Sequence, residues 1–424
     1  MLTAEQNERL CRVGPGTPMG NLMRRYWHPI AATSQLAEEP VKPIRLLGED
    51  LVLFQDASGR LGLIENRCAH RMVKLEYGYP VADGLRCPYH GWTYDGRGAC
   101  VAQPAEPAES TFKEKVRIKS YPVQELCGVV FAYLGPEPAP LLPRWEPLVA
   151  KNLARVLYSS EIPCNWLQAM ENSPDLTHTE WLHGHFAQWH LKRAGYSEDD
   201  LLYQNTLPYT QHQVEIAFER WTYGILRRRL IEGQTKDNEN WSVGIPIMLP
   251  NINLTSNTGP ILLLWRVPID DTHTMQWNLS CFRVGDEAPR DTVPHVEVKL
   301  KDEHGKWNLH ILTVQDAMAF VAQGDILDRT KERLGVGDVG IILYRQMLFE
   351  QLDALEAGRD PINVFRDPQQ NASLELPIFD RDSFLFAGDG KYRKGVATHT
   401  FGIPDTAVAK DLEAVVERAV QARR

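Results

Sequence analysis

Two short cysteine–histidine pairs offer the first clear chemistry in this chain. Cys68 and His70 form a C-x-H pair, and Cys87 and His90 form a C-x2-H pair shortly after it. Two thiolates and two imidazoles can hold a two-iron, two-sulfide cluster, with both cysteines on one iron and both histidines on the other. Neutral imidazoles in place of two thiolates raise the reduction potential of such a cluster, so the pattern predicts a one-electron carrier.

A structural zinc site is the alternative for these four residues. Zinc modules usually place two cysteines together and then two histidines, whereas each pair here has one of each. The following residues, Arg71 and Gly91-Trp92, favour the cluster, because with them the two segments resemble the cluster-binding loops of the Rieske oxygenase family. One departure is Met72, where the family usually has glycine; it bears on the turn of the loop and touches no ligand.

A second candidate metal segment spans residues 171–184. Ser173 and Pro174 suit the start of a helix, and Gly184 suits its end. The sequence therefore predicts one short helix here, beginning at Ser173 and ending at Gly184.

This predicted helix carries several possible ligands. Asp175 and His178 share a face at 3.6 residues per turn, while His183 lies well round the flank. His185 could share the face of His178 if the helix continued. Spacing alone therefore leaves both His183 and His185 possible as the second histidine ligand.

The same segment resembles the N-x2-D-x2-H-x4-H motif of Rieske non-haem iron oxygenases, matched by Asn172, Asp175, His178 and His183. The resemblance implies that His178 and His183 bind a mononuclear Fe(II) with one carboxylate, which leaves positions for O2 and substrate. It implies that Asp175 links His178 to His90 of a neighbouring subunit in a homotrimer. On this basis Asn172 and Asp175 are the predicted catalytic residues. Solvated polar residues on a helix are the alternative for the motif alone.

The third iron ligand must be a carboxylate from elsewhere in the chain. Asp316 lies near the start of a predicted helix and follows Gln315, like the Q-D or E-D pair of phthalate-dioxygenase-like proteins. Asp325 and Asp328 are the alternatives, and both are typical of solvated helix residues. Position along the chain therefore favours Asp316.

Arginines on predicted pocket strands are the candidate substrate residues, because a guanidinium can hold a carboxylate through two hydrogen bonds. They are Arg227, Arg228, Arg229 and Arg266. The alternative is that Arg227 to Arg229 are partly solvated strand or turn residues. Phthalate-dioxygenase-like proteins tend to carry arginine where this chain has Leu226, which disfavours phthalate. Residues 139–144 and 163–172 look more like oxygenases of the dehydrodivanillate O-demethylase type.

The order of apolar runs and turn signals predicts an α+β fold with an amino-terminal antiparallel β Rieske domain and a catalytic domain whose open antiparallel sheet is flanked by helices. Helices are predicted at about 4–12, 19–26, 296–311, 314–333, 338–357 and 405–422, and strands at about 43–134 and 203–285. The proline-rich residues 135–143 predict a linker. The predicted domains are 1–142, with cluster loops at 68–92, and 143–424, which ends in an extension at 359–424.

Composition excludes several classes of protein. The net charge of −9 argues against nucleic acid as a partner. The amino terminus lacks the features of a signal peptide, and the longest uncharged run, residues 241–265, is broken by prolines, so no membrane span is expected. The cysteines outside the two pairs are scattered, as is typical of buried thiols in a reducing cytoplasm.

Nothing in the sequence predicts a flavin or nicotinamide site, since the glycine pairs at 14–16 and 335–337 are isolated. We therefore expect electrons from a separate NAD(P)H-dependent reductase with flavin and iron–sulfur groups, directly or through a ferredoxin. The predicted function is that of a terminal oxygenase that uses O2 to hydroxylate or O-demethylate a substituted aromatic compound, with a methoxylated aromatic acid as the expected substrate. A phthalate-type cis-dihydroxylating dioxygenase and a simple Rieske electron carrier are the alternatives; a carrier has no use for a second iron site.

Overall fold

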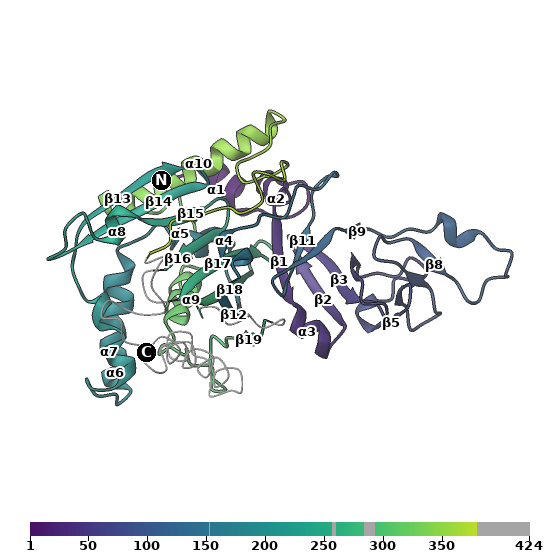
Figure 1. The fold of residues 1–424 in the computed structure, drawn as a ribbon, viewed down its shortest axis with the longest axis horizontal. Helices are drawn as coiled ribbons and strands as arrows, with labels where there is room; N and C mark the ends of the chain where they lie inside the picture. The colour runs from purple at the N-terminus through teal and green to yellow at the C-terminus, as the bar shows by residue number, and fades with distance from the viewer. Residues whose placement is uncertain (152, 257–259, 284–292, 380–424) are drawn as a thin grey trace.

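The computed structural model describes residues 1–151, 153–256, 260–283 and 293–379. Within these residues the chain forms a smaller half with three short sheets and a larger half built on one long sheet (Figure 1). This arrangement confirms the predicted α+β fold. The helix predicted at 405–422 lies outside the described residues.

The smaller half consists of antiparallel sheets with the orders β1–β11–β10, β2–β3–β4–β9 and β5–β6–β7–β8. Their strands are β1 (Trp27–Ala32), β2 (Val41–Leu46), β3 (Glu49–Gln55), β4 (Leu61–Glu65), β5 (Tyr79–Val81), β6 (Gly84–Arg86), β7 (Thr93–Tyr94), β8 (Cys100–Ala102), β9 (Ser120–Tyr121), β10 (Val123–Leu126) and β11 (Val129–Tyr133). Apolar side chains of the second and third sheets share one core with Cys68 and Cys87. The sheets therefore hold the two cysteine–histidine pairs against a common interior.

The larger half is built on a sheet with the order β13–β14–β15–β16–β17–β18–β12–β19. Its strands are β12 (Leu153–Ile162), β13 (Gln213–Trp221), β14 (Gly224–Ile231), β15 (Ile245–Met248), β16 (Ile252–Thr255), β17 (Ile261–Pro268), β18 (Thr274–Arg283) and β19 (His295–Glu297). Neighbouring strands are antiparallel except for β19, which runs parallel to β12. The predicted open antiparallel sheet is confirmed, with β19 as an addition.

The two faces of the long sheet differ in chemistry, because successive side chains on a strand point to opposite faces. Trp265 pairs with Trp277 on one face, and the Trp265 ring lies 6.1 Å from Phe131 of the smaller half. On the other face Arg266 pairs with Gln276, and both are buried. One face therefore joins the two halves, while the other carries buried polar side chains such as Arg266 together with an apolar cluster that includes Leu264.

Three predicted helices are confirmed, as α1 (Ala4–Cys11), α2 (Pro18–Met23) and α10 (Val339–Glu356). The helix predicted at 314–333 is shorter and forms α9 (Leu312–Val321). The helix predicted at 296–311 is wrong, because β19 is followed by a turn. In this turn Asp302 accepts hydrogen bonds from the backbone N–H groups of His304 and Lys306, and Gly305 has a left-handed backbone.

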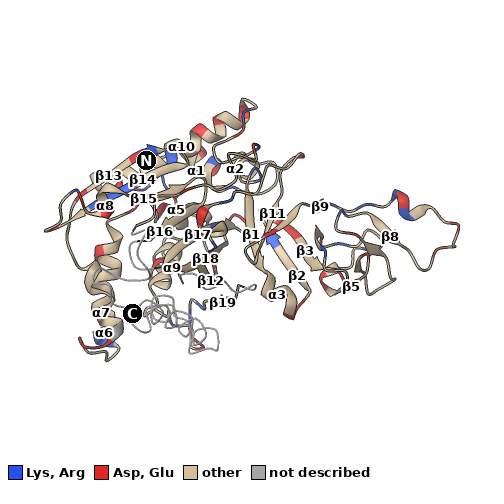
Figure 2. Ribbon diagram, viewed as in Figure 1, with Lys and Arg blue, Asp and Glu red and all other residues tan. Residues whose placement is uncertain are grey.

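The remaining helices are short. They are α3 (Thr33–Glu38), α4 (Glu146–Val149), α5 (Trp166–Glu171), α6 (Ala187–Arg193), α7 (Leu201–Gln204) and α8 (Glu239–Ser242), with the 3-10 turns η1 (Leu75–Tyr77), η2 (Phe112–Lys115), η4 (Leu207–Tyr209) and η5 (Val336–Asp338). None of the described helices is both long enough and apolar enough to cross a membrane. Acidic and basic residues are mixed along both halves of the described chain (Figure 2).

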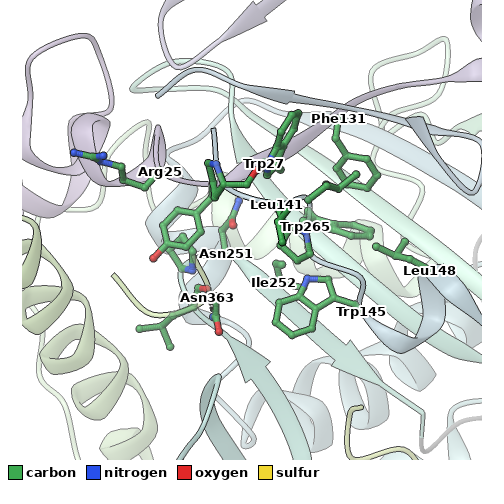
Figure 3. Close-up of a pocket in the computed structure, with 16 residues that line it drawn as sticks. Arg25, Trp27, Phe131, Leu141, Trp145, Leu148, Asn251, Ile252, Trp265 and Asn363 are labelled. Atoms are coloured by element: carbon green, nitrogen blue, oxygen red, sulfur yellow. Dashed lines mark hydrogen bonds between the residues drawn. The ribbon is translucent and has the colours of Figure 1, made fainter. Parts of the chain in front are cut away.

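The linker between the two halves is packed rather than free. The Trp27 side chain donates to the carbonyl of Pro140 at 3.0 Å, and Trp145 and Trp265 lie on the same small pocket (Figure 3). The pocket volume of about 20 Å³ has room for about one water molecule, so the pocket is too small for an aromatic substrate.

The amino-terminal helices lie against the larger half, although the predicted division at residue 142 places them with the smaller one. The Asn7 side chain donates to the carbonyl of Leu327, and the Trp166 side chain donates to the carbonyl of Leu10. The domain division in sequence stays a prediction.

Candidate metal centres

The two cysteine–histidine loops have the same backbone hydrogen bonds. Cys68 N–H donates to the carbonyl of Val73, and the Cys68 carbonyl accepts from Met72 N–H at 2.8 Å. Cys87 N–H donates in the same way to the carbonyl of Trp92, and the Cys87 carbonyl accepts from Gly91 N–H at 3.1 Å. The two loops therefore present their cysteine and histidine side chains in matching turns.

The turn explains the one departure from the family pattern. Gly91 has a left-handed backbone with φ of 75°, and Met72 occupies the equivalent position with φ of 60°. A side chain in this conformation costs about 1–2 kcal/mol, which is why glycine suits the position. The Met72 side chain is exposed, and the loop keeps its turn despite the missing glycine.

The predicted cluster residues lie in two pairs, Cys68 beside Cys87 and His70 beside His90. The Cys68 and Cys87 side chains are buried, and burial and the neighbouring Cys68 raise the pKa of the Cys87 thiol. The His70 and His90 rings lie at the surface with centroids 4.5 Å apart, and His70 stacks on Trp92. A buried pair of sulfur donors and a surface pair of neighbouring imidazoles suit a two-iron cluster with segregated ligands.

Tyr94 was not identified from the sequence as part of this site. Its hydroxyl lies 3.3 Å from the Cys68 sulfur and accepts the Ala69 backbone N–H at 3.0 Å. Because the Ala69 N–H occupies an acceptor position, the phenol proton is free to point at the Cys68 sulfur. Hydrogen bonds to cluster sulfurs raise the reduction potential, so Tyr94 is placed to tune it.

The segment predicted as one helix from Ser173 to Gly184 is folded differently. Helix α5 ends at Glu171, residues 172–177 form turns, and a π-helical segment η3 (Thr179–Phe186) follows and runs into α6. The predicted helix start is therefore wrong. Ser173 caps no helix, and its carbonyl instead accepts a hydrogen bond from the buried Arg227 guanidinium.

The π-helix resolves which histidine joins His178. Its hydrogen bonds span five residues, so side chains five apart lie on one face, which an α-helix does not allow. The His178 and His183 rings accordingly lie 5.2 Å apart, and His183 is 4% exposed. His185 lies outside against Trp181. Gly184 permits this packing, because a Cβ there would meet the Tyr209 carbonyl at 2.8 Å.

Helix α9 brings Asp316 to these histidines. Asp316 Oδ1 lies 3.2 Å from His183 Nε2 and 3.7 Å from His178 Nε2, and the three side chains form a group of possible metal ligands. Asp325 and Asp328 are exposed, and the Asp328 carboxylate binds Thr330 and Lys331 instead. The structure therefore places Asp316, the favoured carboxylate, beside the two histidines, and places neither Asp325 nor Asp328 there.

This donor set suits a divalent cation. Burial raises the pKa of Asp316, but the neighbouring His183 and His178 outweigh it and hold the pKa below its usual value. An ionised carboxylate in a buried site requires a positive partner. Two imidazoles and one carboxylate on one side of a site are the ligand pattern of non-haem Fe(II).

The two other motif residues border the same site. The Asn172 amide donates to Asp316 Oδ1 at 3.2 Å and lies 3.1 Å from His178 Nε2. Asp175 Oδ2 lies 3.6 Å from His178 Nδ1, which is an ion-pair distance rather than a hydrogen bond. Burial raises the pKa of Asp175, but His178 and Thr177 outweigh it and lower the pKa to about 2.

The four candidate substrate arginines divide into two groups. Arg228 lies on the outer face of β14, where it pairs with Glu219. Arg227 and Arg229 lie on the inner face and bind Asn253 and Thr179. Arg266 is 2% exposed, sits over the Phe320 ring, and has two nitrogens without hydrogen-bond partners, while Arg227 has one. Burial lowers the pKa of Arg266 to about 10 although Asp316 raises it.

Comparison with known proteins agrees with these two centres. The model of the Rieske [2Fe-2S] domain matches residues 26–122. The terminal oxygenase of carbazole 1,9a-dioxygenase from Nocardioides aromaticivorans IC177 has the same fold, with a TM-score of 0.59 and 22% identity over 82% of this chain and 96% of that one. Fold and site together define a class, the two-centre oxygenases with a Rieske domain.

Two relatives identify the family. The chain is 42% identical over 395 residues to the 5,5'-dehydrodivanillate O-demethylase oxygenase subunit of Sphingobium sp. (strain NBRC 103272 / SYK-6), covering 91% of this chain and 88% of the relative. It is 33% identical over 400 residues to the phthalate 4,5-dioxygenase oxygenase subunit of Pseudomonas putida, covering 86% and 89%. The chain belongs to the Rieske non-haem iron oxygenases and is the oxygenase component of such a system, with a [2Fe-2S] cluster and a mononuclear iron as cofactors.

Proposed function

We propose that Cys68, His70, Cys87 and His90 hold the cluster and that His178, His183 and Asp316 hold the iron. The observation that carries the second assignment is the convergence of His178, His183 and Asp316 in one buried group. An iron held by these residues would supply O2 activation for insertion of oxygen into a substrate. Asn172 borders the site, where its amide contacts His178 and Asp316. A ligand that displaces these contacts would leave the amide able to donate a hydrogen bond to it.

Electron transfer between the centres is proposed to cross from one subunit to the next. The cluster loops and η3 lie in different halves of the chain, with the long sheet between them (Figure 1). His90 is partly exposed, and the Asp175 side chain keeps 27% of its surface exposed, so both can reach a second copy. Asp175 would then connect His178 to the partner's cluster, as predicted, within a homotrimer.

A methoxylated aromatic acid is the proposed substrate. The 42% identical relative is named for O-demethylation of dehydrodivanillate. Arg266 is the favoured carboxylate-binding residue, because its unpaired nitrogens are buried within electrostatic range of Asp316. Arg227 is next, with one unpaired nitrogen, and Arg229 and Arg228 follow because their partners within the chain already occupy them.

The other components of the system are proposed from the same basis. A separate NAD(P)H-dependent reductase, directly or through a ferredoxin, would supply electrons. The oxygenase of carbazole 1,9a-dioxygenase, which has the same fold as this chain, has been solved in complex with its ferredoxin. That complex supports an electron donor that docks on the oxygenase. None of the described cysteines is joined in a disulfide, and this supports the proposed reducing, cytoplasmic location.

Metal and sulfide analysis of anaerobically purified protein tests this function. We expect about three irons and two sulfides per chain, and a Rieske electron paramagnetic resonance (EPR) signal after reduction with dithionite. His178→Ala should lose one iron and keep the signal, while Cys87→Ser should lose the signal. Two irons in both the wild type and His178→Ala would leave a Rieske electron carrier and refute the oxygenase assignment for these residues.

A further inference from the structure

Gln315 is a buried amide, 5% exposed, that precedes Asp316 on α9. Its Oε1 lies 2.8 Å from His183 Nδ1, and its Nε2 donates to the carbonyl of Leu309 at 2.7 Å. Both ends of the amide are therefore occupied. The sequence drew attention to Gln315 only as the neighbour of Asp316.

The Leu309 carbonyl determines how the amide is oriented. A carbonyl oxygen only accepts hydrogen bonds, so the amide nitrogen of Gln315 must face Leu309. The amide oxygen then faces the imidazole and also only accepts. His183 Nδ1 must consequently carry the proton that forms this hydrogen bond.

The ring of His183 is left with one free position. With the proton on Nδ1, the lone pair of the neutral imidazole lies on Nε2. That atom is the one that lies 3.2 Å from Asp316 Oδ1. Two acceptor atoms at this distance are held together favourably only by a shared proton or a cation between them.

We propose that Gln315 is the positioning residue that holds His183 in the tautomer and ring orientation needed to bind iron through Nε2. The proposal rests on the proposed function, because it takes His183 and Asp316 as iron ligands. The proposal also distinguishes the groups that orient the two histidine rings. Asp175, partly exposed, lies beside His178, whereas a buried neutral amide fixes His183.

The same arrangement links two ligands through one helix. Gln315 and Asp316 are consecutive on α9, so the helix supplies one ligand and the group that orients another. Groups that orient a metal-bound histidine typically contribute 10–100-fold to metal affinity. A displacement of α9 should therefore weaken two ligands at once.

The test compares two buried amide side chains. Gln315→Leu removes the acceptor for His183, whereas Asn371→Leu removes an amide that donates to the Leu142 carbonyl and accepts from the Arg144 N–H, outside α9 and the proposed iron ligands. Fe(II) affinity is measured anaerobically on the full-length protein by competition with a chelator, and the cluster signal serves as the internal reference. We expect about 10–100-fold weaker Fe(II) binding for Gln315→Leu and less than about threefold change for Asn371→Leu.

Gln315→Glu separates orientation from packing. A carboxylate still accepts the His183 proton, but its other oxygen faces the Leu309 carbonyl, so stability should fall while Fe(II) affinity stays within about tenfold of wild type. Equal Fe(II) loss in the Leu and Glu variants, or equal loss in both Leu variants, would overturn the proposed role. Wild type without mononuclear iron would instead refute the proposed function itself.

Discussion

The two metal centres of this protein are built in different ways. The proposed cluster residues lie between 68 and 90 on two loops that share the same backbone hydrogen bonds. The proposed iron ligands are His178, just before η3, His183 within η3, and Asp316 on α9. The contact between His183 and Gln315 spans 132 positions of sequence. The first centre carries its geometry in local turns, whereas the second exists only when distant elements pack correctly.

Long-range support for the iron centre is concentrated at Glu171, the last residue of α5. Its carboxylate accepts from Arg329 at 2.7 Å and from Arg345 at 2.6 Å, and all three side chains are buried. Arg329 also donates to Asn7 of α1. Through Arg329 and Arg345, the Glu171 carboxylate links α5 to α1, to α10 and to the segment after α9. Glu171 directly precedes Asn172 in the sequence.

Breaking this contact should give the largest effect. Glu171→Gln leaves the buried Arg329 guanidinium without a carboxylate partner, whereas Arg345 keeps Glu332. The uncompensated charge of Arg329 is expected to cost about 3–5 kcal/mol of unfolding free energy. Urea unfolding followed by tryptophan fluorescence measures the loss, and metal analysis should show mononuclear iron lost before the cluster signal.

The exposed pair of Asp360 and Arg366 provides the control. Asp360→Asn should cost no more than about 1 kcal/mol, because solvent screens such pairs. If Glu171→Gln proves equally mild, or removes the cluster as readily as the iron, the contrast between the two centres is wrong.

This contrast also explains what the sequence could predict. Ligand types and short spacing were enough to predict a Rieske cluster in this part of the chain, because turn geometry depends on neighbouring residues. For the iron centre the α-helical period left His183 and His185 open, since a π-helix has no sequence signal of its own. Asp316 was favoured by its position along the chain, and the structure places it with the histidines.

The substrate arginines show the same limit. The sequence grouped Arg227, Arg228 and Arg229 as one basic cluster, but strand alternation sends Arg228 to the opposite face. The unpaired nitrogens of Arg266 depend on which partners the fold places nearby, so no local pattern could reveal them. Burial of polar side chains is a tertiary property.

A change confined to the cluster side should have an intermediate effect. Tyr94→Phe removes the hydroxyl that lies 3.3 Å from the Cys68 sulfur and leaves the ring in the core. A loss of about 1 kcal/mol of hydrogen bonding to the reduced cluster would lower its reduction potential by about 40 mV. Redox titration followed by EPR measures this shift, with Tyr121→Phe, whose hydroxyl binds Glu49, as the control. An unchanged potential would mean that the hydroxyl does not donate to the sulfur.

The smallest expected effect comes from making the two cluster loops alike. Met72→Gly relieves the left-handed strain of about 1–2 kcal/mol, but glycine adds freedom to the unfolded chain worth about 0.5–1 kcal/mol. The exposed Met72 side chain contributes little burial, so stability should rise by no more than about 1 kcal/mol. Gly91→Met should do the opposite, because its Cβ would also meet Pro104 at 3.0 Å. Chemical unfolding of both variants measures these changes in stability. A Met72→Gly variant clearly less stable than wild type would show that Met72 supports the loop by a contact rather than straining it.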